Sequence, residues 1–182
     1  MRQHADLKAR YQNYLLFFRL GDFYELFNDD AKIASELLQL TLTQKRTKKD
    51  QPGIPMCGVP FHAAEGYIAK LIAAGHKVAL CEQTETPAEA KARAGSKALV
   101  QRDVTRLFTS GTLTEEAMLP SGQNNYLLAL TPASGGIGAA WLDLSTGEFM
   151  LQQAAHADLS ALLARLNPAE IITPTALSLI HI

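Results

Sequence analysis

The stretch Tyr14-Leu-Leu-Phe-Phe-Arg-Leu-Gly-Asp-Phe-Tyr-Glu-Leu-Phe27 decides the fold of the first part of the chain. Residues 14–20 form an apolar, aromatic-rich run that is typical of a buried strand. Gly21 breaks this run, and Asp22 and Glu25 then have the three-residue spacing of a helix capping box. The stretch therefore predicts a buried strand over 14–20 and a helix that begins at Asp22, with Phe23 in its first turn.

Strands and helices continue to alternate outward from this stretch. A short amphipathic helix is expected before it, since Leu7 and Tyr11 lie one helical turn apart. The predicted later strands are 40–43, 76–81 and 99–108. The predicted later helices are 62–74 and one that begins at Pro87, inside the capping box of Thr86 and Glu89. Residues 44–51 are predicted to be a basic, solvated loop and 52–60 an irregular turn rich in Pro and Gly. The pattern indicates an α/β domain over 1–108, a mixed sheet flanked by helices.

A second unit is expected after a linker at 109–123. Its predicted strands are 126–131, 137–144, 148–152 and 170–173, with a helix capped by Asp158 before the last of them. This order of elements is the start of a second α/β unit over 124–182. We expect that unit to be truncated, with an open sheet edge after Thr173 and less protection from hydrogen exchange than the first domain.

The composition of the chain excludes several classes of protein. The chain has 182 residues, of which 47% are hydrophobic and 19% charged, so a packed core is expected and whole-chain disorder is excluded. No apolar run approaches the ~20 residues of a membrane-spanning helix, and the N-terminus lacks the apolar core of a secretory signal. The sequence predicts a cytoplasmic protein that has no membrane partner and keeps Cys57 and Cys81 as free, buried thiols.

The charges are divided unevenly along the chain. Residues 1–108 carry 16 of the 17 basic residues and 12 of the 18 acidic ones, a net charge of +4. The remainder carries only Arg165 against six carboxylates, a net charge of −5. Such a division suggests two units with different partners, the basic one facing a polyanion.

Enzyme motifs are largely missing. The sequence contains no GxxxxGK[ST] loop, GxGxxG or HExxH, and its five histidines have no metal-ligand spacing. Asp143, Glu148 and Asp158 are carboxylates of the kind that hold a metal in a nuclease, although each also fits a turn or a helix cap. A small metal-dependent α/β nuclease and a protein-interaction domain therefore remain alternatives to a DNA-binding module. No catalytic or metal-ligating residue is assigned.

Gly21 to Phe27 is also the segment that could carry function. In one interpretation Phe23 belongs to the core and Glu25 completes the capping box. In the other, Phe23 projects from the turn as an exposed wedge beside a polar group. Apolar wedges that enter between base steps from the minor groove are how several proteins kink DNA.

Four blocks support the second interpretation, because together they resemble the N-terminal domain of the MutS family of bacterial mismatch-repair proteins. They are Leu20-Gly-Asp-Phe-Tyr-Glu-Leu-Phe27, Asp29-Asp30-Ala31, Ile54-Pro-Met-Cys-Gly-Val-Pro-Phe-His-Ala63 and Cys81-Glu-Gln83. The blocks occur in family order over residues 1–110. Thr112-Leu-Thr-Glu-Glu116 resembles the linker of the family, and Trp141-Leu-Asp-Leu-Ser-Thr-Gly-Glu-Phe149 resembles the start of its RNase H-like connector domain.

The resemblance implies roles for named residues. Phe23 matches the phenylalanine that stacks on a mispaired base, and Glu25 the glutamate that hydrogen-bonds the same base. A carboxylate is unusual near phosphates, so Glu25 either accepts from a base N–H or is protonated and donates to a ring nitrogen. The basic loop of the family, which contacts DNA, is matched by Lys45, Arg46, Lys48 and Lys49, although its length and charge differ here.

The resemblance also implies what this chain lacks. Full-length members are DNA-dependent ATPases, and their ATP and Mg²⁺ sites and homodimer interface lie in regions that have no counterpart here. We therefore expect no enzyme activity and no cofactor in this chain, mismatched or looped duplex DNA as its partner, and a MutL-type partner at the connector. The tail Leu177-Ser-Leu-Ile-His-Ile182 does not match the family pattern.

Overall fold

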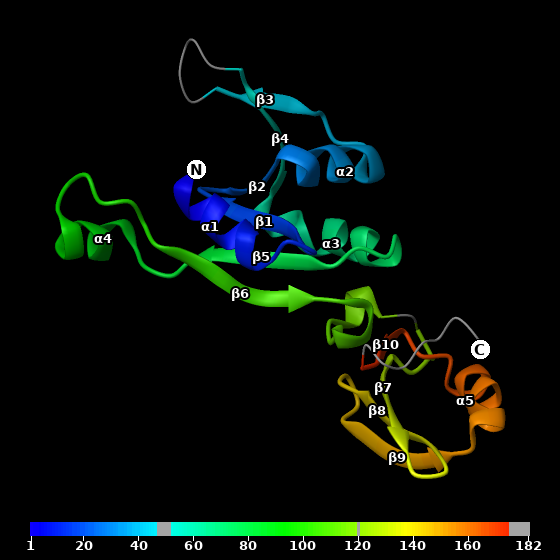
Figure 1. The fold of residues 1–182 in the computed structure, drawn as a ribbon. Helices are drawn as coiled ribbons and strands as arrows, with labels where there is room; N and C mark the ends of the chain where they lie inside the picture. Colours follow the sequence, from blue (N-terminus) through cyan, green and yellow to red (C-terminus); the bar gives the residue numbers. More distant parts are fainter. Residues whose placement is uncertain (47–51, 120, 175–182) are drawn as a thin grey trace. The chain divides into compact units, whose positions relative to one another are not determined.

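A computed structural model of the chain describes residues 1–46, 52–119 and 121–174. The chain divides into two compact units, Met1–Phe108 and Thr109–Ile182, each with its own sheet and helices (Figure 1). The expected α/β class is therefore confirmed for both parts of the chain.

The first unit is built on a six-stranded mixed sheet of order β3-β4-β2-β1-β5-β6. Its strands are β1 Leu15–Leu20, β2 Phe23–Phe27, β3 Thr43–Lys45, β4 Ile54–Pro60, β5 Val78–Gln83 and β6 Arg102–Phe108. Only β1 and β5 run parallel, and every other neighbouring pair is antiparallel. β1 lies inside the sheet, and its first four residues are buried, as its apolar run predicts.

Helices cover both faces of this sheet. They are α1 Arg2–Arg10, α2 Asn28–Leu38, α3 Ala64–Ala73 and α4 Pro87–Ala94. α1 places Leu7 in a cluster with Phe18 and Phe27 on one face. On the opposite face, the thiol of Cys57 on β4 donates to the carbonyl of Ala31 on α2, at 3.5 Å. The core of the unit thus lies on both faces of this one sheet.

The expected helix start at Asp22 is wrong. Residues 23–27 form β2, which pairs with β1 in an antiparallel hairpin, and α2 begins only at Asn28. Gly21, at φ +59°, and Asp22 are the two loop residues of the hairpin. The alternation of exposed Phe23 with buried Tyr24 has the period of a strand. Because residues 23–27 pair with β1 and β4, they form a strand although Asp22 and Glu25 have the spacing of a helix capping box.

The turn expected at 52–60 is also wrong, since Ile54–Pro60 is β4, which pairs with β2 and β3. The prolines are tolerated because of where they lie in the ladder. Pro60 is the last residue of the strand. Pro55 lies one residue beyond Met56, the last partner of β2, and pairs only with Gln44 of the three-residue strand β3. A missing N–H at either place disrupts few hydrogen bonds.

Strand boundaries differ from the predictions elsewhere in the first unit. The strand expected at 40–43 runs from Thr43 to Lys45, so Lys45 belongs to a strand and not to a solvated loop. The strands expected at 76–81 and 99–108 begin at Val78 and Arg102. The helix behind Thr86 has both hydrogen bonds of the predicted capping box.

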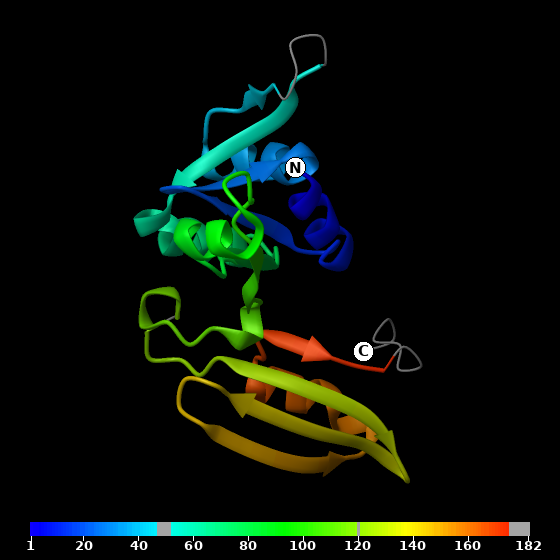
Figure 2. The same ribbon diagram turned by 90° about the vertical axis from the view of Figure 1, so that its left-hand side faces the viewer.

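The second unit is a four-stranded sheet of order β10-β7-β8-β9 (Figure 2). Its strands are β7 Tyr126–Ala133, β8 Gly136–Asp143, β9 Glu148–Ala154 and β10 Glu170–Ile172, and α5 Leu159–Leu166 follows β9. β10 runs parallel to β7, and the other pairs are antiparallel. Leu159, Leu162 and Leu166 of α5 pack with Leu128 and Trp141 in the core of the unit.

The segment expected to be a linker contains two short 3₁₀ turns, Ser110–Thr112 and Glu116–Met118. The first residues of this segment form hydrogen bonds with residues 169 and 170 of the second unit. Ser110 Oγ donates to the carbonyl of Ala169 at 2.8 Å, and Gly111 N donates to Glu170 Oε2 at 3.1 Å. Within the described part of the chain, no helix is long and apolar enough to cross a membrane.

Candidate nucleic-acid interface

The end of the β1–β2 hairpin presents an exposed aromatic side chain. Phe23 is the first residue of β2, directly after the two-residue turn, and it is 48% exposed. Its cross-strand neighbours are Leu20 on β1 and Pro60 on β4. The expected exposure of Phe23 is confirmed, but its cause is the end of a hairpin and not the first turn of a helix.

Glu25 lies on the same face of β2 as Phe23, because side chains two residues apart on a strand share a face. Its partner on β4 is Gly58, where a Cβ would lie 3.8 Å from the Cγ of Glu25. A Cβ there would make only ordinary van der Waals contacts, so the space beside Glu25 does not by itself require a glycine. Phe23 and Glu25 are brought together by the strand and not by a capping box.

The sequence predicts four basic residues beside these two, and the structure describes two of them. Lys45 Nζ lies 2.5 Å from Glu25 Oε2. Arg46 follows the strand and is exposed. Lys48 and Lys49 lie outside the described residues. The structure therefore pairs Lys45 with Glu25 and leaves phosphate contacts as a prediction.

The hairpin end is supported from its other face by three residues that the sequence analysis did not single out. Tyr24 donates its hydroxyl to Glu82 on β5, and burial and this hydrogen bond raise the pKa of Tyr24 to about 12. The guanidinium of Arg19 lies 5.3 Å from the ring centroid of Tyr24 and 4.0 Å from that of Phe61. These contacts connect β1, β2 and β5 directly behind the turn.

Phe61 is a second exposed aromatic at this end of the sheet, 44% exposed. Its N–H donates to the carbonyl of Asp22 at 2.9 Å, so it is tied to the hairpin turn. The only sequence signal for it is its place directly after Val-Pro60 in one of the four family-like blocks. Glu82 likewise lies in such a block, where its role is to hold Tyr24.

A hollow of about 570 Å³ lies on the α1 side of the same sheet. Its apolar floor includes Phe18 and Leu20, the latter being the cross-strand partner of Phe23. Arg2 and Arg102 line it against the carboxylate of Asp6, together with Lys45, whose charge is offset by its ion pair with Glu25. This surplus of positive charge favours an anionic partner at this face.

Two of the three carboxylates of the nuclease alternative, Asp143 and Glu148, accept hydrogen bonds from the protein. The third, Asp158, stands at the N-cap position of α5, but its side chain makes no capping hydrogen bond there, so the predicted cap is wrong. Asp143 is buried, and it accepts from Asn125 N at 2.9 Å, Ser145 N at 2.9 Å and Ser145 Oγ at 2.6 Å. Burial alone would raise the pKa of Asp143, but these hydrogen bonds lower it below its usual value. Glu148 Oε2 accepts from the Tyr126 hydroxyl at 3.0 Å. In the ranges that the structure describes, no three His, Cys, Asp or Glu side chains could hold a metal together.

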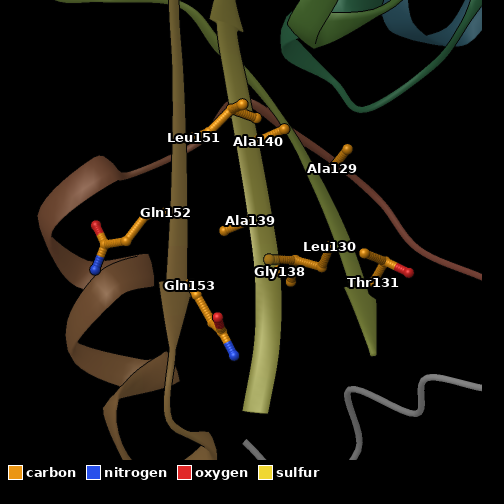
Figure 3. Close-up of a pocket in the computed structure, with 9 residues that line it drawn as sticks. All are labelled: Ala129, Leu130, Thr131, Gly138, Ala139, Ala140, Leu151, Gln152 and Gln153. Carbon is orange, nitrogen blue, oxygen red and sulfur yellow. The ribbon is translucent and has the colours of Figure 1, made fainter. Parts of the chain in front are cut away.

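The second unit carries an open hollow of about 410 Å³ on β7, β8 and β9 (Figure 3). Small and apolar side chains such as Ala129, Ala140 and Leu151 line it, together with Gln152 and Gln153. None of its lining residues is titratable, so it offers no acid–base chemistry. The two thiols are equally unsuited to catalysis, because burial raises the pKa of Cys57 to about 11 and that of Cys81 to about 12.

Comparison with known proteins finds matches for both units of the chain. The family model of MutS domain I matches residues 1–117, and that of MutS domain II matches residues 125–181. The DNA mismatch repair proteins MutS of Rhodopseudomonas palustris (strain HaA2) and Nitrobacter hamburgensis are each 53% identical over 182 residues. That of Zymomonas mobilis is 52% identical over 177 residues. Each alignment covers 97% of this chain but 20% of the relative, so the chain spans about a fifth of the length of these proteins.

Proposed function

The chain belongs to the MutS family, and from this premise we propose that it is the part of a DNA mismatch repair protein that recognises mismatched or looped duplex DNA. The observation that carries the proposal is the exposed ring of Phe23 at the end of a supported hairpin, with Glu25 next to it on the same face. The two family matches and the two arginines of the adjacent hollow, Arg2 and Arg102, support it.

The proposed mechanism is selection of weak base steps by a wedge. Phe23 enters a base step from the minor groove and stacks on one base, while the duplex kinks around it. Unstacking costs a few kcal/mol and costs least where a base is mispaired. A wedge that fits any base therefore favours mismatches without reading sequence, since every base has a π-face.

In this proposal Glu25 gives the wedge its second contact. A stacked base still presents a polar edge, and a carboxylate beside the ring is placed to hydrogen-bond it. Phe23 is held by the backbone ladders of β1 and β4. It can therefore enter a base step without first being ordered, which limits the entropy lost on binding.

The rest of the repair activity is proposed to lie in the longer protein. Its remaining regions would bind ATP and Mg²⁺ and form the homodimer, and the second unit would offer the surface for a MutL-type partner. The chain itself then acts as a DNA-binding module in the cytoplasm, without enzyme activity of its own.

The test is binding of matched, mismatched and looped duplexes by the chain placed in a full-length MutS protein, with and without Phe23→Ala. We expect tighter binding of the mismatched and looped duplexes, and loss of that preference in Phe23→Ala with residual binding to all duplexes. Mg²⁺-dependent cleavage of plain duplex would support the nuclease alternative instead. No binding at low salt would support a protein-interaction domain.

A further inference from the structure

Lys45 reaches Glu25 along the face of the sheet. In the ladder, Lys45 of β3 pairs with Ile54 of β4, whereas Glu25 of β2 pairs with Gly58, four residues further along β4. The lysine side chain bridges this offset by running over Phe27, with its ammonium 5.4 Å from the ring centroid. Nζ then donates to Glu25 Oε2 at 2.5 Å.

The pair is partly shielded from water. The Glu25 side chain is 18% exposed and that of Lys45 is 34% exposed. Both groups are therefore less screened than two charges on the open surface. The aromatic ring of Phe27 under the ammonium further defines where the Lys45 side chain lies.

The hydrogen bond leaves Glu25 able to contact a base. Lys45 uses Oε2, and a carboxylate has two oxygens with about four acceptor positions in all. Lys45 also offsets a negative charge that phosphates would otherwise repel. An ammonium bound to Glu25 is correspondingly less available to a phosphate, whereas Arg46 next to it is exposed.

We propose, resting on the proposed function, that Lys45 is a positioning residue for Glu25, which holds the carboxylate beside Phe23 and offsets its charge, and is not one of the phosphate contacts. Lys45 then contributes to the preference for mismatched over matched DNA, which phosphate contacts do not change. Arg46, one residue further along, is its matched control.

The experiment measures dissociation constants for a mismatched and a matched duplex, with the chain placed in a full-length MutS protein. The variants are Lys45→Met, Lys45→Arg, Arg46→Met, Glu25→Gln and the double variant Lys45→Met/Glu25→Gln. The readout is the ratio of the matched to the mismatched constant. A thermal unfolding midpoint for each variant shows that it is folded.

We expect Lys45→Met to lower the ratio to that of Glu25→Gln, and the double variant to lower it no further, because both changes remove the same interaction. Lys45→Arg should keep the ratio, since a guanidinium can hold the same carboxylate. Arg46→Met should weaken binding to both duplexes equally and leave the ratio unchanged.

Two results would overturn the inference alone. One is a Lys45→Met ratio equal to or higher than that of the unmodified protein, as for Arg46→Met. The other is a double variant whose ratio falls below that of Glu25→Gln by the full effect of Lys45→Met. An unmodified protein with a ratio of one would instead reject the proposed function, and this inference with it.

Discussion

At the scale of single residues, the candidate interface separates the side chains that hold the fold from those that meet DNA. Phe23 and Phe27 are the two ends of the same strand, yet Phe23 is 48% exposed and Phe27 is 1% exposed. Two phenylalanines of one strand thus have different environments, and each serves as a control for the other.

We expect Phe23→Ala to change the free energy of unfolding by roughly less than 1 kcal/mol, because an exposed ring contributes little to the core. Phe27→Ala, the matched control, should cost about 3–5 kcal/mol, since it removes a fully buried ring. Thermal or denaturant unfolding of both variants measures this. A Phe23→Ala loss as large as that of Phe27→Ala would show that Phe23 is a core residue and not a wedge.

Glu25→Ala should have a milder effect on DNA binding than Phe23→Ala. It removes a contact to the base and also a negative charge near phosphates, so binding to matched duplex should stay the same or strengthen while the preference for mismatches falls. Titration of both duplexes at one fixed salt concentration measures both effects. Weaker binding to matched duplex would contradict the expected charge effect.

At the scale of elements, α1 docks on the first sheet through a histidine. His4 is buried, with its ring centroid 5.4 Å from that of Phe18 and 4.9 Å from that of Phe27. Burial lowers the pKa of His4 from 6.5, although the nearby carboxylate of Asp30 acts in the opposite direction. The helix is therefore attached in part through a side chain whose neutral form is favoured by burial.

We expect the stability that His4 contributes to be full above pH 6.5 and to fall as the pH is lowered below 6.5. In that range the unfolded chain binds the proton that the folded chain excludes, so acid favours unfolding. His4→Leu should make the unfolding midpoint less dependent on pH between about 5 and 7. Thermal unfolding over this range, with the unmodified chain as control, checks the prediction, and identical pH profiles would contradict it.

At the scale of the whole molecule, the two units differ in charge and in how completely their sheets are covered. The first unit has helices on both faces of its sheet and carries a net charge of +4. In the second unit every residue of β9 from Glu148 to Gln153 is exposed, and the net charge from residue 109 onward is −5. The charge difference follows from composition along the chain, whereas the exposure of β9 does not, since its apolar residues Phe149, Met150 and Leu151 are exposed.

Neutralising Arg46, Lys48 and Lys49 together, with Lys45 kept, should weaken binding to matched and mismatched duplexes by the same factor. The slope of log affinity against log salt should become shallower by up to about 3, because each side chain that neutralises a phosphate adds about one to that slope. Arg165→Gln, in the acidic unit, is the control and should leave the slope unchanged. An unchanged slope in the triple variant would show that these three residues are only solvated.

Amide hydrogen exchange should be faster in β9 than in β8. β9 is an exposed strand at the edge of its sheet, whereas β8 lies between two partners and alternate side chains along it are buried. β1 of the first unit, which is inside its sheet, is the reference for slow exchange. Equal protection of β8 and β9 would contradict this prediction.

The sequence by itself determined the α/β class, most elements and the candidate wedge. Long periodic or apolar runs, such as β1 and α3, form the predicted structures because local pattern and burial agree there. The family-like blocks identified Phe23 and Glu25 directly. The exposure expected for Phe23 also proved correct, although its predicted helical position was wrong.

Only the tertiary structure decided the local structure around that wedge. Asp22 and Glu25 have a genuine capping-box spacing, but strands on both sides of residues 23–27 offer more backbone hydrogen bonds than a helix start does. The strand β4 was likewise not predicted, because its prolines and glycines resemble a turn locally. Its partners β2 and β3, which are distant in sequence or known only from the sheet, determine that these residues form a strand. The contact of Lys45 with Glu25 joins residues twenty positions apart. It depends on sheet register, which local sequence patterns do not specify.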